Sequence, residues 1–393
     1  MDYNPFLPEV QANPFPYYTY LRHHAPVYQV PGVGCWAISR YDDVLSALKN
    51  PHLFSSSIIT AAFAGDLDPF PPQTPAIIAS DPPDHTRLRK LVNRAFTPRR
   101  VAALEQHIRE VVDNLLARIP AQGEFDLVKQ LSGPLPVIVI AELLGVPPEE
   151  RDTFKRWADS FVRATSGMVV SAEERAEIRQ SLSDFFAYFR KAIAAYRNRP
   201  GDNLLSDLVR AEEEHQTLSA EEILSVAAFL ILAGSETTAN LISNAMLALL
   251  AHPEQLAQVR ANPALVTSVL EETLRYDGPI QNLFRLATQE TEVAGTTIPA
   301  GSPVLLLVGS ANHDERKFPD PGRFDMMRNT EGHVGFGFGI HFCLGAQVAR
   351  LEAKAALEGL LRRFPRLSRT DAAIPRVESA VVRGPKALPL VVG

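Results

Sequence analysis

Hydrophobic residues recur at helical spacing along most of the chain. Between residues 101 and 119, apolar side chains stand three or four positions apart, at 101, 104, 108, 111, 112, 115, 116 and 119, which predicts a helix. Thr97 followed by Pro98 supplies a cap and a proline suited to the first helical turn. Similar patterns predict further helices at residues 41–49, 135–144, 151–165, 172–197, 204–214, 263–276 and 344–363.

The longest predicted helix begins at Ser219 and ends before Pro253. Ser219 and Glu222 have the spacing of a capping box, in which each side chain bonds to the backbone of the other residue. At about 1.5 Å per residue this helix is roughly 48 Å long, enough to cross the whole molecule. Its most apolar run, 223–234, has only 12 residues, against about 20 needed to span a bilayer. We therefore expect no membrane segment.

Alternating or β-rich patterns are confined to short stretches. They predict strands at 25–29 and 35–39, a strand-rich region at 286–308 and terminal strands within 375–393. Residues 55–83 contain many prolines and little periodicity, which predicts a long loop whose apolar residues favour a lid or pocket wall. The predicted fold class is mainly α with a minor β portion. No linker or repeat divides the chain, so we expect a single large domain over residues 1–393.

Composition narrows the possible functions. The chain has 393 residues, 46% of them hydrophobic, and a net charge of −6, which argues against general nucleic-acid binding. The N-terminal sequence lacks the basic and apolar regions of a signal peptide, so we expect a cytoplasmic protein. The two cysteines, Cys35 and Cys343, are too few for a disulfide framework or a multi-cysteine metal site. The alternating pattern around Cys35 predicts a buried apolar position.

Cys343 lies in a glycine-rich loop, from Phe336 to Gly345, that leads into a predicted helix. Gly337 and Gly339 permit backbone turns and a close approach to a flat ligand. The helix N-terminus lowers the pKa of a nearby thiol and can hydrogen-bond a sulfur ligand. A lone thiolate held in this way suits one axial position on an iron porphyrin, because the macrocycle supplies four other ligands. The alternative is a buried structural cysteine beside a turn.

A second unusual segment, from Ala233 to Thr238, lies in the middle of the longest helix. Its glycine, acid and two threonines are poor helix formers for a buried position, and such a conflict often marks function. A threonine hydroxyl that bonds back to a carbonyl can bend the helix and open a notch.

Together these segments resemble the cytochrome P450 family. The cysteine loop matches the family's haem-binding signature at Phe336, Gly339, His341, Cys343 and Gly345, and the later-helix motif Glu-x-x-Arg is present at Glu272 and Arg275. The resemblance extends over essentially the whole chain. It implies a soluble bacterial haem-thiolate monooxygenase that carries haem b (iron protoporphyrin IX), with Cys343 as the one protein ligand of the iron.

The resemblance also assigns structural and cofactor-binding roles. It implies that Arg323 completes a fold-holding group with Glu272 and Arg275. The residues expected to contact the haem propionates are His85, Arg89, Arg285 and His341, and those expected along the rest of the haem are Phe336, Gly337, Ala233 and Gly345. Positively charged donors suit propionates, since partly buried carboxylates need charge-assisted hydrogen bonds.

The family's acid–alcohol pair maps onto Glu236 and Thr237. Cleavage of dioxygen needs two protons delivered to its outer oxygen atom. The resemblance implies that Thr237 donates a hydrogen bond during this step and that Glu236 carries protons from solvent.

Substrate and electron supply follow from the same resemblance. Mainly apolar residues form the expected pocket walls at 55–80, 161–170, 229–233, 279–284 and 381–382, which indicates a hydrophobic small-molecule substrate. No flavin or ferredoxin module is fused, so electrons are expected from a separate ferredoxin and its reductase. A basic cluster fits docking of an acidic ferredoxin, and its members are Arg87, Lys90, Arg94, Arg99, Arg100, Lys354, Arg362 and Arg363.

Two other functions stay open. One is a peroxide-driven, desaturating or coupling haem oxidase of the same family, and the other is a non-catalytic haem protein that senses or carries a gas. The Glu236–Thr237 pair argues against the sensor, which needs no proton relay, and against a peroxygenase, since such members usually lack the pair.

Overall fold

The computed structural model describes residues 2–63, 67–71, 73–74, 76–165, 171–213 and 216–393. The chain divides into two compact units. The first unit comprises Met1–Ser55, Glu105–Leu135 and Thr237–Gly393, and the second comprises Ser56–Leu104 and Pro136–Glu236. The helices reach 32 residues in length, whereas the described strands have two to six residues, which confirms the predicted mainly α class with a minor β portion.

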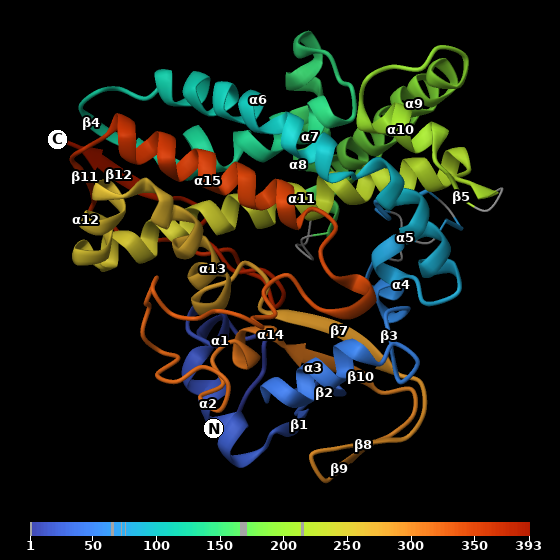
Figure 1. The fold of residues 1–393 in the computed structure, drawn as a ribbon. Helices are drawn as coiled ribbons and strands as arrows, with labels where there is room; N and C mark the ends of the chain where they lie inside the picture. The colour runs from blue at the N-terminus through green and yellow to red at the C-terminus, as the bar shows by residue number, and fades with distance from the viewer. Residues whose placement is uncertain (1, 64–66, 72, 75, 166–170, 214–215) are drawn as a thin grey trace. The chain divides into compact units, whose positions relative to one another are not determined.

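A five-stranded sheet organises the first unit (Figure 1). Its order is β1 (Val27–Val30), β2 (Cys35–Ile38), β10 (Pro303–Leu307), β7 (Asn282–Ala287) and β3 (Phe54–Ser55). Strand β10 pairs parallel to β2 and antiparallel to β7, so segments more than 260 residues apart lie side by side. The predicted strands at 25–29 and 35–39 are confirmed to within two residues.

Alternation along β10 gives the sheet two apolar faces. Val304 and Leu306 pack with the buried face of α3 (Tyr41–Lys49), whereas Leu305 and Leu307 pack with the N-terminal helices α1 (Pro8–Ala12) and α2 (Phe15–His24). This is the period-2 geometry of a strand that is buried on both sides. The two N-terminal helices are short, and hydrophobic spacing alone did not predict them. Helix α1 begins at Pro8, and α2 is preceded by Pro14.

Apart from β4 (Gly123–Asp126), the remaining α-helices and strands of the first unit lie in the C-terminal half of the chain. They are α12 (Pro253–Ala261), α13 (Val266–Tyr276), α14 (Val308–Ala311), α15 (Ala346–Arg363), β8 (Thr291–Val293), β9 (Thr296–Ile298), β11 (Leu367–Arg369) and β12 (Pro389–Val392). Strand β12 pairs with β11 and with β4.

Helix α11 (Ala220–Ala251) is the long helix predicted from the sequence, and it belongs partly to each unit. The predicted capping box is present: the Glu222 amide donates to Ser219 Oγ at 3.1 Å, and the Ser219 amide donates to Glu222 Oε2 at 2.8 Å. By length and composition alone α11 could cross a membrane, but half of its most apolar window is buried inside the protein, as in a core helix. Two other helices cross the unit boundary, α6 (Pro98–Ala117) and α7 (Pro134–Leu143).

The second unit is helical and holds an aromatic core. Its helices are α4 (Ile58–Phe63), α5 (Asp84–Ala95), α8 (Arg151–Thr165), α9 (Ala172–Asn198) and α10 (Leu204–Arg210), with the short hairpin β5 (Glu212–Glu213) and β6 (Gln216–Thr217). The ring centroids of Trp157 of α8 and Phe185 of α9 are 5.8 Å apart, and those of Phe161 and Phe185 are 4.9 Å apart. Such edge-on contacts fix how α8 and α9 pack.

Two local predictions were wrong. The helix expected at 204–214 ends at Arg210, because Ala211 is extended and β5 follows; residue 214 lies outside the described residues. The loop expected at 55–83 contains α4 and a 3-10 turn, Ile77–Ala79, although residues 64–66, 72 and 75 of that loop lie outside the described residues. Helices of only one or two turns are too short to show a clear hydrophobic period, and the many prolines of this segment favoured the prediction of a loop.

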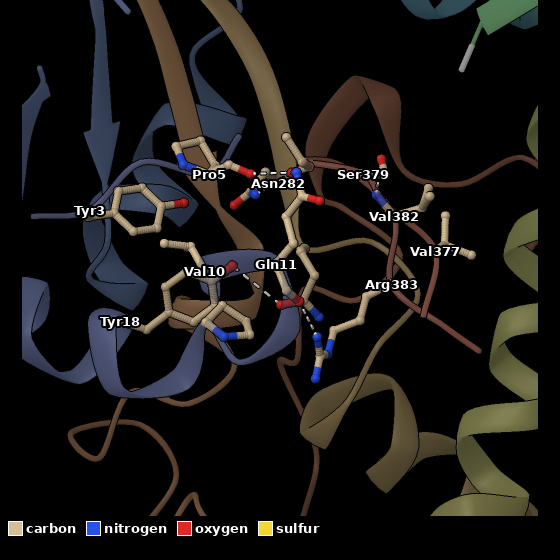
Figure 2. A pocket seen from close by; sticks show the side chains of 13 residues that line it. Tyr3, Pro5, Val10, Gln11, Tyr18, Asn282, Val377, Ser379, Val382 and Arg383 are labelled. Carbon is tan, nitrogen blue, oxygen red and sulfur yellow. Dashed lines mark hydrogen bonds between the residues drawn. The ribbon is translucent and has the colours of Figure 1, made fainter. Parts of the chain in front are cut away.

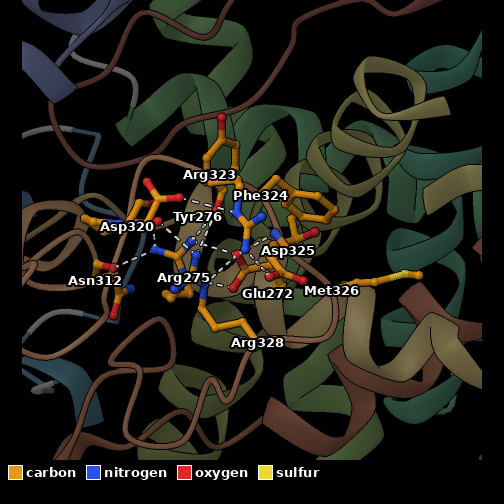
Figure 3. Close-up of polar contacts among 12 residues, drawn as sticks. Glu272, Arg275, Tyr276, Asn312, Asp320, Arg323, Phe324, Asp325, Met326 and Arg328 are labelled. Carbon is orange, nitrogen blue, oxygen red and sulfur yellow. Dashed lines mark hydrogen bonds and ion pairs between the residues drawn. The ribbon is translucent and has the colours of Figure 1, made fainter. Parts of the chain in front are cut away.

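A buried ion pair holds α13 to the loop after α14 (Figure 3). Arg275 donates to both carboxylate oxygens of Glu272 at 2.7 Å, and neither side chain is exposed. The expectation that the Arg323 side chain completes this group was wrong, since that side chain pairs with Asp320 and Asp325. The second arginine at Glu272 is Arg328, whose Nε lies 3.3 Å from Oε1. Arg323 contributes its backbone carbonyl, which accepts a bond from Arg275.

Candidate functional site

The cysteine loop is closed by its own backbone. The Cys343 amide donates to the Phe336 carbonyl oxygen at 2.9 Å, and the Gly337 amide donates to the Val334 carbonyl at 2.9 Å. Gly337 and Gly339 have φ angles of +72° and +70°, the left-handed region that favours glycine. The loop leads directly into α15, and only Leu344 and Gly345 separate Cys343 from its first residue, so Cys343 lies beside a helix N-terminus, as the sequence predicts.

The thiol of Cys343 fits a haem iron better than it fits a metal cluster. Cys343 is half-buried, whereas Cys35 is 3% exposed within β2, as expected of a structural cysteine. Across the described part of the chain, no three His, Cys, Asp or Glu side chains gather as a metal site would require. A single accessible thiol beside a left-handed glycine loop is the donor set expected when a macrocycle supplies the other ligands.

The Phe336 ring at the start of the cysteine loop is held by a cation. The Arg350 guanidinium lies 4.5 Å over the Phe336 ring and is held there by Glu271, at 2.6 Å. Burial opposes ionisation of Glu271, but hydrogen bonds from His333 and Arg350 lower its pKa to about 2. The Phe336 ring is thus fixed by a cation that is itself paired, which orients the start of the loop.

The segment around Glu236 and Thr237 presents one accessible side of α11. Phe229, Ala233, Glu236 and Thr237 fall on the same helical face and are half-buried, whereas the opposite face is buried. Burial raises the pKa of the Glu236 carboxyl above its usual value, so this group keeps its proton to a higher pH than an exposed glutamate does. The helix continues unbroken through this segment, and Ser235 Oγ donates back to the Ile231 carbonyl at 2.8 Å. The predicted bend at the threonines stays a prediction.

The expected propionate donors are divided between the two units. Arg285 lies on β7 and is 3% exposed, and His341 lies in the cysteine loop, both in the first unit. His85 and Arg89 lie four residues apart on α5 of the second unit, as predicted. Burial, and then the charge of Arg89, lowers the pKa of His85 to about 4.

Two of the expected substrate walls meet in the first unit. Ile280 and Val382 form an antiparallel bridge, and the Gln281 amide donates to the Val381 carbonyl at 2.8 Å. Of the wall expected at 161–170, residues 166–170 lie outside the described residues. Sequence reasoning missed Asn244, whose Nδ2 donates to the carbonyls of Asp277 (2.8 Å) and Arg383 (3.1 Å) and so ties α11 to these walls. The signal was available, because an asparagine in a buried apolar helix needs a partner.

Comparisons with known proteins identify the family. The family model for cytochrome P450 matches residues 13–390. The cytochrome P450 monooxygenase PikC of Streptomyces venezuelae is 40% identical over an alignment of 393 positions. The alignment covers 96% of this chain and 91% of PikC. The vitamin D(3) 25-hydroxylase of Pseudonocardia autotrophica is 40% identical over 97% of this chain and 94% of its own.

A solved structure gives the same result for the fold. Cytochrome P450 CYP109Q5 from Chondromyces apiculatus superposes with a TM-score of 0.91 at 41% identity, covering 100% of this chain and 98% of that one. The long central helix and the glycine-rich cysteine loop that the sequence singled out are therefore features of a shared architecture. The chain belongs to the cytochrome P450 family of haem-dependent monooxygenases, oxidoreductases that incorporate oxygen from O₂.

Proposed function

We propose that this protein hydroxylates or epoxidises a hydrophobic small molecule, and that the Cys343 thiolate would hold the iron of its haem b. The observation that carries the proposal is the loop around Cys343, where a half-buried thiol is presented beside left-handed glycines and a helix N-terminus. We also propose that the two units act as one catalytic domain over residues 1–393, in the cytoplasm.

The proposed haem contacts are taken residue by residue from the resemblance to the family. Of these proposed contacts, Phe336, Gly337 and Gly345 belong to the cysteine loop, and Ala233 lies on the accessible face of α11. The proposed propionate donors are His85, Arg89, Arg285 and His341. When bound, the haem supplies the redox chemistry that activates dioxygen, and a cysteine thiolate ligand favours cleavage of the O–O bond.

Glu236 and Thr237 are proposed to manage the protons of that reaction. The Thr237 hydroxyl would donate a hydrogen bond at the accessible face of α11, and the Glu236 carboxyl would pass protons from solvent. The raised pKa of Glu236 supports this role, since a proton carrier works best when its pKa lies nearer the working pH.

A hydrophobic substrate is supported by the walls at 279–284 and 381–382. Ile280, Leu283, Phe284, Val381 and Val382 are half-buried, so these apolar side chains retain accessible surface. One relative is named as a vitamin D(3) hydroxylase, and that name makes a large apolar molecule a sensible first probe.

Electron delivery is proposed to come from an acidic ferredoxin and its reductase. In the first unit, Phe338 and Phe342 of the cysteine loop are 41% and 42% exposed, and Lys49 lies 5.2 Å over the Phe338 ring. An exposed aromatic pair with a cation suits a docking patch. In the second unit the predicted basic cluster is partly neutralised, because Arg87 pairs with Glu222 and Arg100 pairs with Asp202 and Asp207. Arg99 is therefore a better target than Arg100 for testing the cluster.

The spectrum of the reduced carbon-monoxide complex tests the proposal. We expect the red-shifted Soret band of thiolate-ligated haem in the wild type and in Cys35→Ala, and its loss in Cys343→Ala. Cys35→Ala is a matched control because it removes the chain's other thiol. Persistence of the band in Cys343→Ala would contradict the ligand assignment. NADPH-driven product formation with a surrogate ferredoxin system then separates a monooxygenase from a peroxide-driven enzyme or a gas sensor.

A further inference from the structure

A small cavity lies behind the proposed substrate walls, within the first unit (Figure 2). Tyr3 and Tyr18 of the N-terminal segment line one side, Gln281 and Asn282 at the start of β7 line another, and Ser379 and Arg383 of the C-terminal segment complete it. Its volume is about 20 Å³. One water molecule needs about 10–15 Å³ of space for its centre, so the cavity has room for one.

Two buried polar atoms at this cavity, the Tyr3 hydroxyl and Asn282 Oδ1, make no direct hydrogen bond of ordinary length to the described residues. The side chains of Tyr18 and Asn282 lie close enough to the Tyr3 hydroxyl to interact with it. Tyr3 is 1% exposed and Asn282 is 3% exposed, so bulk water does not reach either side chain freely. Figure 2 shows the two side chains pointing toward one another across the cavity. Burial raises the pKa of Tyr3, so its hydroxyl stays a neutral donor. Leaving such groups without a hydrogen bond would be unfavourable.

We infer that this cavity binds one structural water molecule, which accepts a hydrogen bond from Tyr3 and donates one to Asn282 Oδ1. The Tyr18 hydroxyl, which donates to Gln281 Oε1 at 3.3 Å, keeps lone pairs available and offers the water a third partner. A buried water with two to four partners is a regular part of protein structure.

The water joins the N-terminal segment to the back of the substrate walls. Asn282, whose Oδ1 would accept from the water, also donates from Nδ2 to the Ala380 carbonyl. Its side chain therefore already links β7 to the C-terminal segment. Arg383 strengthens the same junction: its amide donates to the Pro279 carbonyl at 2.8 Å, and its guanidinium donates to the carbonyl of Gln11, near the end of α1, at 2.7 Å. Residues 2–18 therefore brace the segments whose other residues are proposed to face the substrate.

Tyr3 and Asn282 are thus positioning residues for substrate recognition, a role that rests on the proposed function of residues 279–284 and 381–382. Neither residue touches the reacting atoms. Their effect is to fix the spacing of the bridge between Ile280 and Val382.

A crystal structure of the wild-type holoenzyme tests the water directly. We expect one density peak within hydrogen-bond distance of Tyr3 Oη and Asn282 Oδ1. An empty cavity, or a direct bond between Tyr3 and Asn282, would overturn the water site.

The positioning role is tested with Tyr3→Phe, which removes only the hydroxyl. Tyr17→Phe is the matched control, since Tyr17 is half-buried, its ring lies 6.4 Å from that of Tyr3, and it does not line the cavity. The probes are vitamin D3 and testosterone, titrated by the shift of the haem spectrum. For Tyr3→Phe we expect weaker binding by about threefold to tenfold with unchanged haem content, and for Tyr17→Phe no change.

Equal affinities in Tyr3→Phe and wild type would overturn the positioning role. Failure of the proposed function would look different, because the wild type itself would then lack the thiolate-type carbon-monoxide spectrum or give no spectral response to any hydrophobic probe.

Discussion

Gly339 of the cysteine loop lies against the carbonyl oxygen of Leu48, the penultimate residue of α3. A β-carbon at Gly339 would be 2.6 Å from that oxygen, and its φ of +70° is one that side-chain-bearing residues rarely adopt. The loop that presents Cys343 therefore packs against the C-terminal end of α3, and both backbone conformation and space require a glycine at this position.

Gly339→Ala should therefore displace the cysteine loop. We expect reduced haem content and a lower midpoint of thermal unfolding, since the added methyl group meets backbone rather than a flexible side chain. Gly322→Ala is the control, because a β-carbon there meets nothing within 4 Å and its φ is not positive. The measurement is the haem content per polypeptide of the two variants. Equal values would show that the cysteine loop accommodates the added methyl group at Gly339 without loss of haem.

Thr237→Ala and Glu236→Gln should affect proton delivery without abolishing substrate binding. Without the Thr237 hydroxyl, electrons should leave largely as hydrogen peroxide, so product formed per NAD(P)H consumed should fall. Glu236→Gln removes the proposed proton carrier and should slow turnover by about 10²–10³-fold, with a larger solvent isotope effect. Unchanged coupling and rate in both variants would contradict the relay and favour the sensor.

Glu272→Gln should destabilise the protein strongly. The substitution leaves the buried Arg275 guanidinium without its carboxylate partner, and breaking a buried pair in this way costs about 3–5 kcal/mol. Arg323→Ala, which removes a side chain that is 64% exposed, should change the free energy of unfolding by less than about 1 kcal/mol. Urea unfolding curves measure both, and similar losses in the two variants would restore Arg323 to the fold-holding group.

Glu352 of α15 should make stability fall as pH rises. Burial raises the pKa of this carboxyl from 4.5 to about 8, and its Oε2 lacks a partner among the described residues. The folded protein thus binds the proton more tightly than the unfolded chain does. The resulting stabilisation is complete below pH 4.5 and is lost as pH rises through about 8, a change on the order of 5 kcal/mol.

Glu352→Gln isolates this effect, because glutamine has nearly the same shape and does not titrate. The difference in unfolding free energy between Glu352→Gln and wild type should increase in favour of the variant from pH 5 to pH 9. A difference that does not vary with pH would mean that Glu352 ionises normally in the folded protein.

The sequence by itself determined the local elements and the cysteine loop. Helices α3 and α8 have the predicted bounds, and α11 has its capping box, because hydrophobic spacing and caps are properties of neighbouring residues. The loop around Cys343 was recognisable because its glycines and its place before α15 are also local.

Tertiary structure decided which distant residues meet. Arg328 rather than Arg323 bonds to Glu272, because the path of the loop after α14, and not residue spacing, sets which side chain reaches the buried carboxylate. Likewise, the N-terminal segment meets Asn282 and Arg383 only because β10 lies between β2 and β7 and carries α1 and α2 on one face of the sheet. Contacts between residues hundreds of positions apart depend on which strands pair in the sheet. Hydrophobic periodicity is a property of neighbouring residues, so it does not predict that pairing.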